Sequence, residues 1–197
     1  MGPRAQDALR EVMNMGAGHA ATALSQMTGL RVMISVPQIR WSAKAAERPS
    51  RFRNDEEVIS ISVALMGEAA ERAALVISRD TADRIVTLRL RHEDEPAGEL
   101  GPLERSTLQE LGNIVCASYV GVLGSLLGSS VMIGPPRLEV VTGEVADLTP
   151  PGGLVIETDF TIREASFQGV FALTHSEMSF AALLGAIGIT DEDAGPV

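Results

Sequence analysis

The sequence contains two similar segments, residues 7–37 and 106–136, which align without a gap at a separation of 99 positions. Nine of the 31 aligned positions carry the same residue, whereas unrelated segments would share roughly two if common residues match at about 7% of positions. Internal duplication therefore explains the similarity better than chance does. Both copies are then expected to adopt the same local structure. The identical pairs are Leu9/Leu108, Glu11/Glu110, Asn14/Asn113, Leu24/Leu123, Gly29/Gly128, Val32/Val131, Met33/Met132, Ile34/Ile133 and Pro37/Pro136.

Each copy begins with a pattern that predicts an amphipathic helix. Apolar residues recur every three or four positions, which places them on one helix face. Gly29 and Gly128 stand where a helix C-cap is expected, and Pro102 suits the start of the second helix. A strand is expected after each helix, at 32–36 in the first copy and from 131 toward 141 in the second. The apolar stripes comprise Leu9, Met13, Ala17, Ala20, Leu24 and Met27 in the first copy and Leu108, Leu111, Val115, Tyr119, Val122 and Leu126 in the second.

The remainder of each half predicts two further strands and a second helix. The strands are expected at 58–65, 69–78, 154–162 and 166–173, the helices at 80–90 and 176–187, the loops at 41–57 and 141–153, and an acidic linker at 92–102.

These elements predict an α+β fold. Consecutive strands joined by modest loops favour antiparallel pairing, and neither half alone would bury much apolar surface. We therefore predict a single domain over residues 1–197, with pseudo-two-fold symmetry between halves at about 5–91 and 102–188. Each half runs helix, strand, strand, strand, helix, so that about six strands form one antiparallel sheet, or two abutting ones, covered by the long helices.

Composition argues against several classes of function. The formal net charge is -10 and aromatic residues make up only 4%, so binding to nucleic acid or to an anionic membrane surface is not expected. Residues 111–136 carry no charge, but their serines and the break at Gly128 favour a buried helix followed by a strand over a membrane span. No apolar run follows a basic start at the N-terminus, so we predict no signal peptide and a cytoplasmic location.

Few residues fit other catalytic or metal-binding patterns. Cys116 is the single cysteine and has apolar neighbours, so it is expected to be a buried small hydrophobe rather than a catalytic thiol. The three histidines lack metal-ligand spacing. Gly16 and Gly18 do not follow a strand, so they do not form a phosphate-binding loop. They are expected instead to let another backbone come close to the helix.

The most informative polar residues form a Glu–Asn pair that occurs in both copies. Glu11 and Asn14, and equally Glu110 and Asn113, are three positions apart, so each pair shares one helix face, away from most of the apolar stripe. Asn in the middle of a helix is unfavourable by several tenths of a kcal/mol relative to Ala. One such pair alone would be interpreted as a solvated helix face, but its repetition at equivalent positions favours a functional role.

The doubled pattern resembles the signature of the CheC-type chemotaxis phosphatases, a family that includes CheX and FliY. In that signature three residues separate an Asp or Ser from a Glu, two residues separate the Glu from an Asn, and 22 residues separate the Asn from a Pro. The signature occurs here at Asp7, Glu11, Asn14 and Pro37 and again at Ser106, Glu110, Asn113 and Pro136. The flanking stretches GAGHAATALS and ELGNIVCASYVGVL are also similar to CheC. The prolines are expected to be structural. His19 stands where many relatives carry Asn, and its role is open.

The resemblance implies an enzyme that dephosphorylates the response regulator CheY. The substrate would be an aspartyl-phosphate polarised by the regulator's own Mg²⁺ and Lys, so no cofactor or metal of this chain is expected. The remaining task is to place a water in line with the phosphorus. The amides of Asn14 and Asn113 suit this task because Asn both donates and accepts hydrogen bonds. A carboxylate beside a phosphoryl group would be repelled, so Glu11 and Glu110 are expected to dock on a Lys of the regulator.

Two intact motifs imply two sites per chain, as in CheC, rather than the single motif of CheX. The resemblance also introduces the deamidase CheD as a candidate partner, although no residue identifies its surface. The alternative function is a non-enzymatic interaction protein, either a flagellar-switch relative or a protein whose main role is to bind CheD. A third interpretation is an adaptor without phosphoryl chemistry, in which neither Asn matters.

Overall fold

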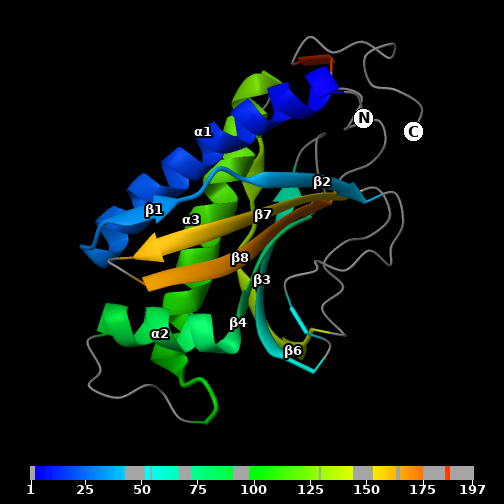
Figure 1. Cartoon of the computed structure of the whole chain (residues 1–197). Coiled ribbons are helices and arrows are strands. Elements are labelled where there is room, and N and C mark those ends of the chain that lie inside the picture. The colour runs from blue at the N-terminus through cyan, green and yellow to red at the C-terminus, as the bar shows by residue number, and fades with distance from the viewer. Residues whose placement is uncertain are drawn as a thin grey trace.

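The fold, taken from a computed structural model, consists of helices packed on an antiparallel sheet (Figure 1). The structure describes residues 3–42, 52–53, 55–66, 72–90, 98–128, 130–143, 153–162, 165–174 and 185–186. The principal elements are α1 (Pro3–Thr28), β1 (Val32–Ile34), β2 (Gln38–Ser42), β3 (Glu57–Met66), β4 (Arg72–Ser78), α2 (Arg79–Leu90), α3 (Pro102–Leu126), β5 (Met132–Ile133), β6 (Arg137–Thr142), β7 (Gly153–Ile162) and β8 (Ala165–Thr174). This arrangement confirms the predicted α+β fold class.

The apolar stripe on each long helix is the face that packs on the sheet, as predicted. All but the last member of each stripe is buried, and the last members, Met27 and Leu126, are partly buried against the same core. This core is shared with alternate residues of β3, β4, β7 and β8, which point toward the helices. The 3.6-residue spacing of apolar residues therefore decides which helix face is free for other uses.

The helix ends follow local chemistry. Gly29 and Gly128 have φ angles of 67° and 62°, in the left-handed region that glycine adopts without strain after a helix. α3 begins at Pro102, as predicted. At the start of α2, the hydroxyl oxygen of Ser78 accepts a hydrogen bond from the backbone N–H of Thr81 at 3.1 Å, which is the N-cap arrangement.

The sheet is built by exchange of strands between the two halves of the chain. Its order is β1-β7-β8-β4-β3-β5, with β2 also on β7 and β6 also on β3. The first strands of each half thus pair with the hairpin of the other half. The registers correspond as well: Gln38 is opposite Glu157, and its repeat equivalent Arg137 is opposite Ser62. Each half completes the sheet of the other, which is how the pseudo-two-fold symmetry is realised.

A β-bulge interrupts the first strand of each half at the motif proline. β1 and β2 both pair with β7, and three residues between them, 35–37, are opposite only two on β7. The same count holds for residues 134–136 between β5 and β6 opposite β3. Pro37 and Pro136 are the last bulge residues, where the absence of a backbone N–H breaks no ladder hydrogen bond.

The observed strands differ from two expectations drawn from the sequence. The strand expected at 32–36 continues beyond the bulge as β2. The bounds predicted for the loop at 41–57 are wrong at both ends. Trp41 and Ser42 belong to β2, and Glu57 begins β3. β2 is an edge strand of mostly polar residues, so its strand conformation depends on pairing with β7 rather than on an apolar pattern.

Several other expectations fall partly or wholly outside the described residues. The helix expected at 176–187 is described only at 185–186, and most of the linker at 92–102 and of the loop at 141–153 is not described. The helix expected at 80–90 and the strands at 58–65, 154–162 and 166–173 are confirmed within two residues at each end. The strand expected at 69–78 is described from Arg72.

The two halves meet where β4 and β8 pair in the middle of the sheet. Leu75 is opposite Phe171 there, and both are buried. The ring of Tyr119 from α3 stacks on Phe171, with ring centroids 4.5 Å apart and 21° between the ring planes. Gly16 of α1 also lies against Tyr119, and a Cβ added at Gly16 would be 2.6 Å from Tyr119 Cδ1. Gly16 therefore permits the close approach of α1 and α3.

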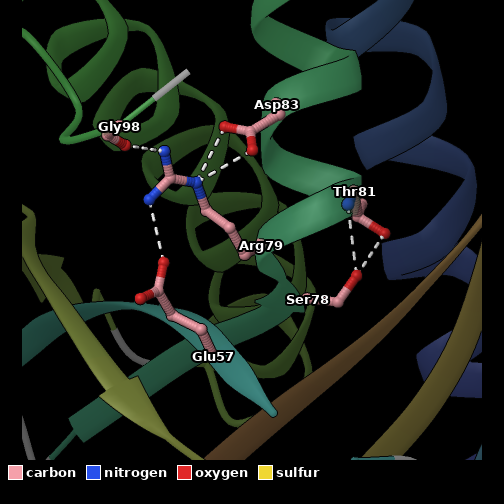
Figure 2. A network of polar contacts seen from close by, with 6 residues as sticks. All are labelled: Glu57, Ser78, Arg79, Thr81, Asp83 and Gly98. Carbon is pink, nitrogen blue, oxygen red and sulfur yellow. Dashed lines mark hydrogen bonds and ion pairs between the residues drawn. The ribbon is translucent and has the colours of Figure 1, made fainter. Parts of the chain in front are cut away.

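A network of polar contacts around Arg79, the first residue of α2, joins the first half to the linker before α3 (Figure 2). Its Nε is 2.9 Å from both carboxylate oxygens of Asp83, and its Nη1 is 2.8 Å from Glu57 Oε1. Its Nη2 donates to the carbonyl of Gly98, which precedes α3. Burial works to lower the pKa of Arg79, but the hydrogen bonds to Asp83 and Glu57 outweigh burial, and the pKa is raised. The network thus holds the linker segment before α3 against the first half.

Packing of α3 on the sheet predicts opposite effects for two glycines of the same helix. A Cβ added at Gly112 would lie 2.3 Å from Ile61 Cγ2, whereas one added at Gly121 meets no atom within 4 Å. We expect Gly112→Ala to lower the free energy of unfolding by about 1–3 kcal/mol through overpacking. Gly121→Ala should raise it by up to about 1 kcal/mol, because Ala favours the helix. Urea unfolding of the two variants checks this, and equal effects would contradict the described packing.

Candidate functional site

The structure places the two motifs on the two long helices. Glu11 and Asn14 on α1 and Glu110 on α3 are exposed, whereas Asn113 on α3 is half-buried. The exposure expected for Glu11 and Asn14 is confirmed. α1 and α3 pack against each other and run in roughly opposite directions (Figure 1). The two motif segments therefore lie toward opposite ends of the helix pair.

The motif side chains have no partners within the described part of the chain. The side chains of Glu11, Asn14, Glu110 and Asn113 form no hydrogen bond and no ion pair with any described residue. Other polar side chains on the same helices bond locally: the hydroxyls of Thr22, Ser25 and Thr28 on α1, and of Ser118 and Ser125 on α3, each donate to the carbonyl four residues earlier. The four motif residues are therefore available to a partner outside the chain.

The surroundings of the two motifs differ. On α1, Arg10 Nη1 is 3.0 Å from Asp7 Oδ1, in an ion pair whose side chains are 50% and 73% exposed, so it contributes little to stability. The equivalent positions on α3 are Gln109 and Ser106. The amide of Gln109 donates to the carbonyl of Pro136 at 3.1 Å, which ties the second motif helix to its own motif proline.

Gln109 was not identified from the sequence. Its contact joins α3 to the bulge before β6, and Arg105 adds a second contact by donating to the carbonyl of Leu138 at 3.3 Å. The only signal for Gln109 in the sequence is its position beside Glu110 within the motif. The first copy has Arg10 there, so comparison of the repeats could not reveal the contact.

The geometry of each Glu–Asn pair suits a macromolecular partner. Residues three apart on a helix have their Cβ atoms about 5–6 Å apart, so one carboxylate and one amide are presented together. Small-molecule sites instead bury most of the ligand surface in a concave pocket. An exposed helix face can enter a site that belongs to another protein and add an amide and a carboxylate to it.

Other candidate groups do not assemble into a site within the described residues. No three His, Cys, Asp or Glu side chains gather there in a metal-binding arrangement. His19 is exposed, and the other two histidines lie outside the described residues. No helix of the described ranges combines the length and the apolar character of a membrane span. Both Gly16 and Gly18 were expected to admit another backbone, yet only Gly16 contacts Tyr119, and Gly18 faces open space.

Cys116 is buried, as predicted, and burial raises the pKa of its thiol to about 12. We therefore expect Cys116 in the folded protein to resist alkylation by iodoacetamide at pH 8.5. In urea the thiol should react at the rate of a free cysteine, because unfolding returns its pKa to the ordinary value. Mass spectrometry of the labelled fraction with time measures this. Fast labelling of the folded protein would contradict the described burial.

Known proteins are similar to this chain in sequence and in fold. The model of the CheC-like family matches residues 5–40 and 103–140, which contain both motif helices and the bulged strands that follow them. The chain is thus similar in sequence to CheC and FliY proteins and similar in fold to FliY, in agreement with the resemblance seen in the doubled motif.

Two relatives are similar over most of this chain. The chain is 26% identical to the CheY-P phosphatase CheC of Bacillus subtilis, over 82% of this chain and 81% of that protein. It is 23% identical to the flagellar motor switch phosphatase FliY of the same organism, over 95% of this chain but only about half, 51%, of that protein.

Solved structures share the fold. FliY of Thermotoga maritima matches with a TM-score of 0.76 and 23% identity, over 95% of this chain and 98% of that one. The FliM middle domain of H. pylori matches with a TM-score of 0.66 and 12% identity, over 94% and 99%. A CheX–CheY–BeF3–Mg²⁺ complex from Borrelia burgdorferi matches with a TM-score of 0.59 and 18% identity, over 83% and 97%.

Proposed function

We propose that this chain is a protein phosphatase that hydrolyses the aspartyl-phosphate of a chemotaxis response regulator of the CheY type, with one site on α1 and one on α3. The observation that carries this proposal is the unpartnered Glu–Asn pair, present twice on helices related by the pseudo-two-fold axis. Relatives named as a CheY-P phosphatase and as a flagellar motor switch phosphatase support it, as does the fold shared with a protein solved in complex with CheY.

The reaction requires a positioned water more than a new catalytic group. A water oxygen attacks the phosphorus, the bond between phosphorus and the aspartate oxygen breaks, and the aspartate leaves as a carboxylate with inorganic phosphate as the other product. Asn14 or Asn113 accepts a hydrogen bond from this water through its carbonyl oxygen, which orients the water lone pair along the line of attack. An amide carries no charge, so it approaches the phosphoryl oxygens without repulsion.

The carboxylates have a different role in this proposal. Glu11 and Glu110 lie one turn before the asparagines, where a negative charge would be repelled by a phosphoryl group but attracted by a Lys of the regulator. We assign them to docking, which brings the neighbouring amide into the regulator's site. Mg²⁺ would belong to the regulator, and no residue of this chain is assigned to it.

The asparagine assignment predicts a two-site pattern of loss. We expect Asn14→Ala and Asn113→Ala each to retain activity through the other site, and the double variant to lose about 100-fold in the rate of regulator dephosphorylation, because water positioning is lost at both sites. Decay of radiolabelled CheY phosphate measures the rate. Gln26→Ala, at an exposed position three turns further along α1, should leave the rate unchanged. A double variant that accelerates decay as much as wild type would refute the asparagine assignment, whereas a wild type that does not accelerate decay would favour a non-enzymatic adaptor.

The glutamate assignment predicts a change in affinity rather than in chemistry. In the Asn113→Ala background, Glu11→Gln should raise KM for the phosphorylated regulator about 10-fold and leave kcat nearly unchanged, because an interfacial charge pair is lost. The effect should shrink as salt is added. Glu139→Gln on β6, where the side chain is exposed, is the matched control. A fall in kcat with constant KM would instead assign Glu11 to the chemical step.

A flagellar-switch role remains the second candidate because the FliM middle domain has the same fold. Fold alone does not select between these functions. The doubled Glu–Asn pair favours the phosphatase, since an interaction protein has no need for two mid-helix asparagines. Binding of CheD and a cytoplasmic location stay predictions from the family resemblance.

A further inference from the structure

Gly18 is a glycine that the fold itself does not require. It lies within α1, and a Cβ added to it would meet no atom of the described residues within 4 Å. Glycine is the least favourable residue for a helix interior apart from proline. Gly16, two residues earlier, has an internal reason to be glycine, since a side chain there would collide with Tyr119. No such contact explains Gly18.

Gly18 lies on the face of α1 that carries the first motif. It follows Asn14 by four residues, so the two positions are neighbours on successive turns. Met15 lies beside them, four residues after Glu11, and its side chain is 58% exposed. An exposed methionine next to a helix residue without a side chain forms a surface on which another protein can pack closely. We call Glu11, Asn14, Met15 and Gly18 the α1 face.

The second motif does not repeat this surface. The equivalent of Met15 is Ile114, which is half-buried against the core, and the equivalent of Gly18 is Ala117. Asn113 is also less exposed than Asn14. The two motifs share the Glu–Asn pair but differ in the surface that adjoins it, so a partner can approach the α1 face more closely than the corresponding face of α3.

We propose that Gly18 is a docking residue of the first site, where the response regulator packs directly on the backbone of α1, with Met15 as the apolar contact at its edge. This inference rests on the proposed function, because the regulator is the partner that Glu11 and Asn14 are assigned to engage. The absent side chain at Gly18 leaves room for the regulator surface around the phosphorylation site to reach Asn14. It follows that the two sites differ, with tighter docking on α1.

The test uses two parent proteins, each with one working site. Asn113→Ala leaves the α1 site, and Asn14→Ala leaves the α3 site. Gly18→Leu in the Asn113→Ala parent should lower kcat/KM for phosphorylated CheY at least 10-fold, mainly through KM, whereas in the Asn14→Ala parent it should change nothing. Met15→Ala should lower kcat/KM about threefold in the first parent only. The affinity for CheY loaded with beryllofluoride and Mg²⁺, measured by calorimetry, should fall in parallel with kcat/KM.

Gly121→Leu is the matched control, since Gly121 is a second exposed helix glycine with open space around it. Both leucine variants should melt at or above the temperature of their parent, and Gly121→Leu should keep full activity. Unchanged kinetics and affinity for Gly18→Leu in an active Asn113→Ala parent would overturn this inference alone. An equal loss in both parents would also overturn it, because the effect would not belong to the α1 site. Parents that neither bind nor dephosphorylate CheY would overturn the proposed function, and this inference with it.

Discussion

The contact between Tyr119, Phe171 and Gly16 is the interaction on which the arrangement of the helices depends. Tyr119 is fully buried, stacks on Phe171 in the middle of the sheet, and occupies the space that a side chain at Gly16 would need. The contact holds α1 against α3 and holds both against the sheet. With their apolar stripes committed to this core, the helices present their polar faces outward. The availability of both Glu–Asn pairs is therefore a consequence of packing on the opposite side of the same helices.

Strand exchange makes the two candidate sites parts of one structure. β1 and β2 complete the sheet beside β7, and β5 and β6 complete it beside β3, so neither half has a full sheet without the other. The duplication has nevertheless diverged outside the core. Arg10 pairs with Asp7 in one copy, while Gln109 holds Pro136 in the other. Such surface differences leave the fold intact and change what each copy presents to a partner.

Local patterns predicted the elements with strong periodicity and clear ends. The helix stripes, the C-terminal caps at Gly29 and Gly128, and the start of α3 at Pro102 all follow from interactions within a few residues. β2 was missed because its polar residues become a strand only through pairing with β7, more than 100 positions later. The half-burial of Asn113 was missed for a similar reason, since helix periodicity gives a direction but not the neighbours found there.

The sequence by itself determined that the chain is a duplicated α+β protein and that each copy carries a Glu–Asn pair on the polar face of a helix. Those properties are encoded in periodicity and in the repeat, which need no knowledge of distant contacts. Only the tertiary structure decided that the halves exchange strands and that Gly16 is covered by Tyr119 while Gly18 stays open. Two glycines on one helix look equivalent in the sequence. They differ because the second helix crosses one of them and not the other.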